Sequence, residues 1–221
     1  VVTVDANKDV SSFRNITITG ELDAGSLDIS GDIDVDGTTN LDAVDVDVSL
    51  TVDGTVKLNG NFPTGTDNVA LGNAALSGGS LSGAGNIAIG DSAGNAITSG
   101  SNAVAIGRDA FGGAYTGSDV IAIGRSAGAA VTSGTQSVFI GGLAGDAINT
   151  AAANVAMGYE ALSTDTKGEQ SVAIGYRALK AQNQSTSANA YNTAVGSQAG
   201  LSMTTGDSNT LIGGLAGDAK T

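Results

Sequence analysis

The chain has 221 residues, of which 34 are glycine and only 4% are aromatic, and it contains no cysteine, histidine or tryptophan. The lack of cysteine and histidine excludes disulfide bonds, most zinc sites and the usual catalytic triads. The net charge of −13 argues against nucleic acid and anionic membranes as partners, and no apolar run approaches the length of a membrane span.

The acidic charge is concentrated in the first sixty residues. Residues 1–60 carry twelve acidic and three basic side chains (−9), whereas residues 61–221 carry ten and six (−4). Between residues 15 and 60 apolar and polar residues alternate, as in the segment 44–48, and the parity reverses twice. Alternation with such reversals predicts short strands separated by turns or bulges. We therefore predict that residues 1–60 form an acidic, β-rich shaft or connector.

Aspartates follow the polar positions of this predicted shaft, among them Asp42, Asp45 and Asp47. Stacked carboxylates can bind calcium, an ion that prefers oxygen ligands, so these three residues are candidate metal ligands. A solvated acidic face, which keeps a fibre soluble and discourages pairing at strand edges, is the favoured interpretation. The chain contains neither an EF-hand loop nor the glycine-rich calcium nonapeptide, so we expect no cofactor unless it is calcium.

From residue 61 onward, the chain repeats one phrase, Asn/Ser-x-Ala-Ile-Gly-x-x-Ala, nine times. Successive copies lie 17 residues apart, except for one interval of 18 and one of 21. In seven copies a second glycine lies seven residues before the glycine of the phrase. The glycines of the phrase, called motif glycines below, are Gly72, Gly90, Gly107, Gly124, Gly141, Gly158, Gly175, Gly196 and Gly213.

The repeat predicts a stacked β architecture. Triplets such as residues 172–174 (Val-Ala-Ile) alternate large, small and large side chains, which is typical of a short strand. Glycines at fixed offsets predict turns that need positive φ or close backbone approach, and Asn189, in place of one second glycine, fits a left-handed turn. A unit folded back once gives two short strands and two turns, and stacking buries its apolar face. The sequence thus predicts an all-β solenoid or β-roll with 17-residue coils over residues 61–221.

Two patterns concern packing between coils. The central residue of the triplet is Ala except for Phe139 and Leu211, and in those two copies the residue after the motif glycine is Gly142 or Gly214. The larger side chain could fill volume left by the smaller one, although duplication of one repeat variant explains the coincidence equally well. The row of central alanines predicts a flat apolar stripe on a monomer, which further copies of the chain would cover.

One insertion and three tyrosines are candidates for receptor contact. The insertion spans residues 180–190, and a protruding polar loop there, with Gln184 in it and Tyr191 beside it, could contact a sugar or protein. A tolerated bulge is the favoured alternative. Tyr159 and Tyr176 occupy equivalent positions in adjacent repeats and predict a stacked pair, which is usually structural, although exposed tyrosines also bind glycans.

The repeat phrase resembles a known family. The strings NVALG, NIAIG, NAVAIG and SVAIG, each followed by x-x-Ala, are similar to the head repeats of trimeric autotransporter adhesins. The segment YNTAVGSQAGLSMTTGDSNTLIGGLAGDA, residues 191–219, resembles repeats of phage tail fibres still more, and the opening VDANKDVSSFRNITITGELDAG resembles the connector that precedes such repeats. This resemblance implies a left-handed parallel β-roll with three chains packed about one axis, either side by side or intertwined.

The resemblance implies a structural virion protein, a section of tail or head fibre that forms a rigid homotrimeric rod and can attach to a host surface glycan or protein. Its expected partners are two further copies of itself and other virion proteins, without nucleic acid or membrane insertion. One alternative is a trimeric adhesin head on a bacterial cell surface, binding matrix or glycans. Another is a catalytic or non-catalytic fragment of a polysaccharide-degrading tailspike, although no enzymatic activity is expected.

Overall fold

The computed structural model describes residues 66–78, 81–184 and 186–218. All described residues belong to one unit of the chain, Val56–Thr221. The predicted shaft and its candidate calcium ligands Asp42, Asp45 and Asp47 therefore lie outside the described residues. Regular secondary structure in the described part consists of strands alone, which confirms the all-β prediction.

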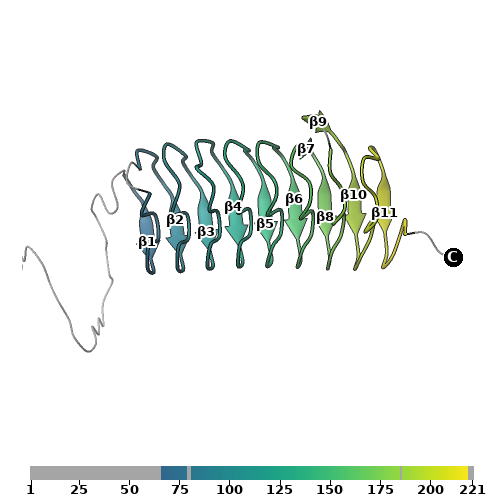
Figure 1. Ribbon diagram of the computed structural model, residues 1–221, viewed down its shortest axis with the longest axis horizontal. Coiled ribbons are helices and arrows are strands. Elements are labelled where there is room, and N and C mark those ends of the chain that lie inside the picture. Colours follow the sequence, from purple (N-terminus) through teal and green to yellow (C-terminus); the bar gives the residue numbers. More distant parts are fainter. Residues whose placement is uncertain (1–65, 79–80, 185, 219–221) are drawn as a thin grey trace, which may run out of the picture. The chain divides into compact units, whose positions relative to one another are not determined.

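A parallel nine-stranded sheet runs along the whole described segment (Figure 1). Each strand pairs with the strand of the next repeat, so the chain completes one turn of a solenoid per repeat. The predicted β-solenoid with coils of about 17 residues is confirmed. Its strands are β1 (Val69–Leu71), β2 (Ile87–Ile89), β3 (Val104–Ile106), β4 (Ile121–Ile123), β5 (Val138–Ile140), β6 (Val155–Met157), β8 (Val172–Ile174), β10 (Thr193–Val195) and β11 (Thr210–Ile212).

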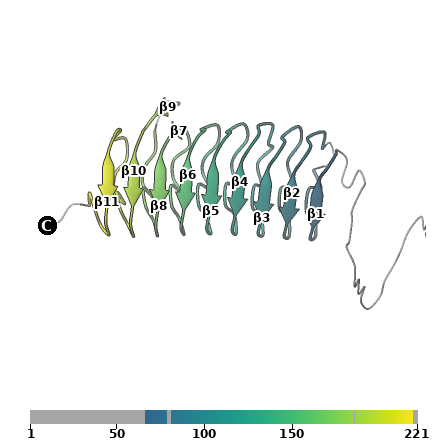
Figure 2. The ribbon, with the colours of Figure 1, turned by 180° about the vertical axis from the view of Figure 1, so that it is seen from behind.

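The strands keep one register throughout the sheet. Ala88 of β2 lies opposite Ala105 of β3, and Ala173 of β8 lies opposite Ala194 of β10 despite the 21-residue interval between them. The register survives because the additional residues enter a loop that carries β9 (Ala188–Asn189), which pairs with β7 (Gly168–Glu169). Figure 2 shows β7 and β9 at the edge opposite the one toward which the strands of the large sheet point.

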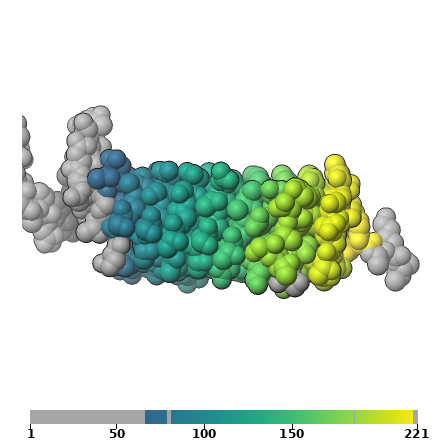
Figure 3. Space-filling view, turned by 90° about the horizontal axis from the view of Figure 1, so that it is seen from above, coloured from purple at the N-terminus to yellow at the C-terminus, as the bar shows by residue number. Residues whose placement is uncertain are grey.

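Each coil contains one regular strand instead of the two that the sequence predicted. Turns and bends form the rest of the coil, apart from the β7–β9 pair and an isolated parallel bridge between Ser101 and Ser118. Hydrogen bonds between coils nevertheless continue outside the strands, for example from the Gly94 amide to the Ala110 carbonyl oxygen at 2.9 Å. Every coil is therefore held by its neighbour at several points, and in Figure 3 the coils form successive bands of one elongated body.

The two sets of glycines serve different purposes. The motif glycines end the strands with φ between +121° and +139°, and a Cβ on Gly124 would lie 2.6 Å from the carbonyl group of Gly141 in the next coil. Among the described second glycines, all except Gly206 are required for space: a Cβ on Gly117, whose φ is not positive, would lie 2.8 Å from the ring of buried Tyr115. Asn189 lies in β9 without positive φ, so its predicted left-handed turn is wrong.

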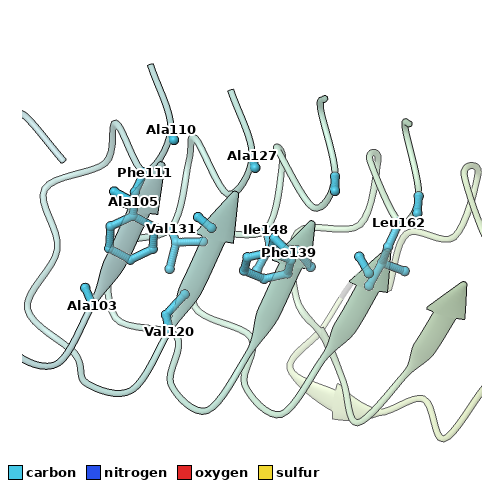
Figure 4. Packing of buried hydrophobic residues seen from close by; sticks show 14 of the residues in the cluster. Ala103, Ala105, Ala110, Phe111, Val120, Ala127, Val131, Phe139, Ile148 and Leu162 are labelled. Atoms are coloured by element: carbon cyan, nitrogen blue, oxygen red, sulfur yellow. The ribbon is translucent and has the colours of Figure 1, made fainter. Parts of the chain in front are cut away.

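The central alanines point into the coil, and the predicted alanine stripe on the surface is wrong. Ala88, Ala105, Ala122, Ala156, Ala173 and Ala194 are completely buried. Large side chains enter the same narrow interior from the turn that follows the strand, either four residues after the motif glycine, as Phe111 and Leu162 do (Figure 4), or seven residues after it, as Ile97, Val131 and Ile148 do in coils with a glycine at the fourth position. Because these side chains occupy the interior, the strand can contribute only a small one, and its valines and isoleucines face outward.

Phe139 and Leu211 are large central residues, and each lies over the glycine four residues after its motif glycine, a position that is also glycine in the coils of Ala88, Ala122 and Ala194. Phe139 is fully buried and lies over Gly145, which takes the place that Leu162 has in the next coil. Leu211 likewise lies 2.9 Å from the position of a Cβ on Gly217. Gly142 is not the partner of Phe139, because a Cβ there would instead contact the Tyr159 ring at 3.4 Å. A Cβ on Gly214 would likewise meet only the Ser197 carbonyl oxygen, at 3.8 Å, so the predicted compensation by Gly142 and Gly214 is wrong.

Candidate binding surfaces

The first candidate surface is the outer face of the nine-stranded sheet, called the strand face below. The residues on either side of each buried central residue point outward, and no charged residue occurs in any of the nine strands. Monomeric proteins seldom expose a continuous apolar surface of this extent. The large side chains exposed here, at 36% to 71%, are Leu71, Ile87, Ile89, Ile121, Met157, Ile174 and Ile212.

The second surface is the edge toward which the strands point in Figure 1, called the turn edge below. The residue after each motif glycine contributes one position per coil to this edge, and seven of the nine positions carry a side chain. Neighbours in this row contact each other, as shown by the hydrogen bond of 3.0 Å from the Asn73 amide to the Asp91 carboxylate. The row consists of Asn73, Asp91, Arg108, Arg125, Gly142, Tyr159, Tyr176, Ser197 and Gly214.

Tyr159 and Tyr176 form the expected stacked pair on the turn edge. Their ring centroids lie 5.9 Å apart with an interplanar angle of 12°, and the residues are 42% and 44% exposed. The guanidinium carbon of Arg177 lies 5.0 Å from the centroid of the Tyr176 ring, within the range of a cation–π interaction. Arg177 has φ of +56°, so a tight left-handed turn places it beside the ring. The pair is therefore accessible and fixed by its neighbours.

Ion pairs fix the charged residues around the tyrosines. The Glu160 carboxylate accepts hydrogen bonds from Nζ of Lys180 and, at 2.7 Å, from Nε of Arg177. The hydrogen bond from Lys180, together with that from Arg177, lowers the pKa of Glu160, and the hydrogen bond to Glu160 raises the pKa of Arg177. One carboxylate thus pairs with two cations, and the carboxyl group of Asp146 lies close enough to interact electrostatically with Glu160 and Lys180 as well.

Basic residues are unevenly distributed over the described coils. Arg108, Arg125, Arg177 and Lys180 lie on the turn edge or contact it, whereas Lys167, the remaining basic residue of the described part, belongs to another side of its coil. Arg108 lies 3.7 Å from Asp109, and both side chains are largely exposed. Arg125 is exposed and forms no ion pair with any described residue. The basic residues of the described coils are therefore concentrated at the turn edge, where the acidic residues Asp91, Asp109 and Glu160 also lie.

The third surface is the insertion loop, which comprises the described residues 183–184 and 186–190 of the predicted insertion. Tyr191, directly after it, is 53% exposed, and its hydroxyl oxygen accepts a hydrogen bond of 2.8 Å from the Asn189 amide. Gln184 donates a long hydrogen bond of 3.4 Å to the Thr205 carbonyl oxygen in the following coil. The structure thus brings Tyr159 and Tyr176 together on the turn edge, whereas Gln184 and Tyr191 belong to the connection between β8 and β10.

A buried polar cluster beneath the insertion loop was not predicted from the sequence. Asp165 and Gln182 are fully buried, and the Gln182 amide donates to the Asp165 carboxylate at 2.6 Å. Asp165 also accepts from the Gly168 amide at 2.9 Å, and Gln182 accepts from the Asn192 side chain at 2.9 Å. These bonds join the beginning and end of the insertion. The sequence signal that could have revealed the cluster is a change of residue type. Asp165 and Gln182 are each the seventh residue after their motif glycine, a position that holds a buried Ile97, Val131 or Ile148 in other coils.

Two kinds of site are absent from the described part of the chain. Residues 66–78, 81–184 and 186–218 contain no group of three acidic side chains placed to hold a metal ion. The same residues form no helix with the length and apolar character needed to cross a bilayer.

The hydroxyl of buried Tyr115 has no hydrogen-bond partner among the described residues, and burial raises the pKa of Tyr115 above the ordinary value of tyrosine.

Comparisons with protein-family models, with curated proteins and with solved structures gave no match. The coordinates themselves establish the parallel β-solenoid, since strand order, register and coil length agree along the described residues. A function must accordingly be argued from the strand face, the turn edge and the insertion loop.

Proposed function

We propose that this chain is a section of a virion fibre, from the tail or the head, in which three copies pack together as a rigid rod. The strand face is the single observation that carries the proposal. It is uncharged in every strand and apolar apart from Thr193 and Thr210, and it repeats with each coil, so one symmetric contact between copies extends along the whole array. Three copies, rather than two, follow from the resemblance of the repeat phrase to trimeric adhesin heads and phage fibres.

The coils support a mechanical role. Each one is hydrogen-bonded to the next, and the buried residues form one continuous core from Leu76 to Ala199. In such a solenoid every coil provides the template and the apolar partner for its neighbour, which makes the array stiff along its axis. A stiff rod carries a receptor-contacting tip away from the particle, and its own surface can contact the host as well.

Light scattering after gel filtration tests the assembly. The expected mass is about three times the chain mass of 21.4 kDa. Ile121→Lys places a charge at the centre of the strand face, and burying an unpaired charge is so unfavourable that the variant should dissociate to monomers while its circular dichroism stays unchanged. Ser133→Lys, at an exposed bend of the same coil, is the matched control. A monomeric wild-type chain, or a trimer unaffected by Ile121→Lys, would contradict the proposal.

A second candidate function is a trimeric adhesin head on a bacterial surface that binds matrix or glycans. The exposed Tyr159–Tyr176 pair favours it, because exposed aromatic rings are suitable for sugar binding. Both functions require the trimeric rod, and they differ in whether the rod belongs to a virion or to a bacterial cell surface. A coding sequence beside capsid and tail genes supports the fibre, and a membrane-anchor domain downstream of residue 221 supports the adhesin.

A further inference from the structure

We infer that the turn edge binds an acidic polysaccharide, which lies along the rod from Arg108 to Tyr176. This inference rests on the proposed function, because it names the chemistry by which a fibre of this kind would attach to a host surface. The observations that carry it are the alignment of two arginines and two tyrosines, the exposure of the tyrosine rings, the local charge, and the tolerance of the fold for other residues at these positions.

The four side chains stand in one row because the strands before them are in register. Strands β3, β4, β5, β6 and β8 pair residue for residue, so the residues after their motif glycines are also aligned. At a strand spacing of about 4.8 Å, the row from Arg108 to Tyr176 is roughly 19 Å long. Gly142 separates the arginines from the tyrosines and contributes no side chain. A linear polymer can therefore contact both pairs at once.

The tyrosine pair suits a sugar ring. Contacting carbon atoms lie about 3.5–4.0 Å apart, so rings with centroids 5.9 Å apart overlap only in part and leave apolar surface uncovered. The C–H groups on one face of a pyranose ring pack well on such a surface. Arg177 and Glu160 hold Tyr176 in place before any ligand arrives, which reduces the entropy lost on binding.

The charge at the edge selects an acidic chain over a neutral one. The guanidinium of Arg125 has no carboxylate partner among the described residues, and arginine binds a carboxylate through two parallel hydrogen bonds. Uronic acids supply a carboxylate on every ring, so one polymer satisfies the arginines and the tyrosines.

The solenoid does not need these side chains for folding. The equivalent position is Gly142, Ser197 or Asn73 in other coils, which adopt the same strand and turn. Replacing an arginine or tyrosine in this row by Ser therefore reproduces a residue that the coil already accepts. This interchangeability also makes the test interpretable, since the variants keep their fold.

Calorimetric titration of the full chain at low salt tests the inference with three probes of matched length: hexagalacturonate, neutral maltohexaose and hexaglutamate. The expected result is binding of hexagalacturonate alone. Arg125→Ser and the double variant Tyr159→Ser/Tyr176→Ser should each weaken this binding about tenfold or more, the loss expected for one charged hydrogen bond or one stacking contact. Lys167→Ser and Tyr191→Ser, a basic residue and an exposed tyrosine away from the turn edge, are the matched controls and should bind as the wild type does.

Four results would overturn the inference: no binding of hexagalacturonate, equal binding of hexaglutamate, equal binding of maltohexaose, or unchanged affinity in the turn-edge variants. A change of oligomeric mass in those variants would also overturn it, because the edge would then be a contact between subunits. The mass of every variant is measured by light scattering alongside. A trimer without saccharide binding therefore contradicts this inference only, and a monomer that binds hexagalacturonate contradicts only the proposed fibre assembly.

Discussion

Removing the Phe139 side chain tests how volume is shared inside the coils. Phe139 is fully buried, and a change from Phe to Ala in a core usually destabilises a protein by about 3–5 kcal/mol. The next coil combines Ala156 in the strand with Leu162 in the turn, where Leu162 has φ of +51°. Gly145, at the equivalent turn position, has φ of +57°, so its backbone already has the conformation that a leucine adopts one coil further on.

The double variant Phe139→Ala/Gly145→Leu therefore places the residues of Ala156 and Leu162 at the equivalent positions of this coil, with buried Ile148 where the next coil has Asp165. Gly145→Leu alone should destabilise the wild type, by about 1–2 kcal/mol for the left-handed backbone and about 1–3 kcal/mol for overpacking against Phe139. When Phe139→Ala is already present, the overpacking disappears, and burying a leucine side chain contributes about 1.5–3 kcal/mol. We expect the double variant to be more stable than the sum of the single effects predicts, with a coupling free energy of about 3 kcal/mol.

Guanidinium chloride unfolding followed by circular dichroism, at one fixed protein concentration, measures all four free energies of unfolding. Phe139→Ala/Gly142→Leu is the control, since residue 142 faces Tyr159 on the surface and cannot fill the space left by Phe139. Its two effects should simply add. Additive behaviour of the Gly145 pair, or equal rescue by the Gly142 pair, would refute the idea that strand and turn side chains share one interior volume.

Two further predictions concern single groups. Tyr115→Phe removes a buried hydroxyl without a partner among the described residues, so thermal unfolding should show a variant more stable by about 1–3 kcal/mol; a less stable variant would show that the hydroxyl is bonded. Because the pKa of Glu160 is lowered by Lys180 and Arg177, its ion pairs stabilise the fold fully above the ordinary pKa of 4.5, and this contribution is lost as the pH falls through the lowered value. The melting temperatures of wild type and Glu160→Gln should accordingly differ at pH 7 and converge in acid, and a constant difference would contradict the ion-pair explanation.

The repeat made the architecture predictable, because a fixed interval allows only a fold with a fixed step. Strand position, parallel register and the positive φ of residues such as Gly124 all follow from that regularity. The regularity did not reveal which face of each strand is buried. Alternation shows that Ala122 and its neighbours face opposite sides, without showing which side is inside, and the larger residues were expected there. The interior is instead filled from the turns, by Phe111 and similar residues with φ near +55°, a conformation that sequence patterns seldom predict for large side chains.

The candidate sites were predictable to different degrees for the same reason. Tyr159 and Tyr176 are separated by one period, so their contact could be expected from spacing alone. Arg108 and Arg125 share that spacing and position, but their relation to the tyrosines becomes visible only when the whole row is placed on one edge of the solenoid. The Asp165–Gln182 pair also has the spacing of one period, yet its burial depends on knowing which residues of the turn face inward.

The rows of the solenoid differ in how much freedom they leave to the sequence. Strand centres and turn positions such as Phe139 and Gly145 are coupled through volume, so a change in one requires a change in the other. The row that contains Arg125 and Tyr159 lies on the surface, where side chains from glycine to tyrosine occur on the same backbone. Such a row can acquire or change a ligand by single substitutions while the coil stays intact. A basic and aromatic strip within it therefore calls for an explanation in terms of binding, since folding does not require it.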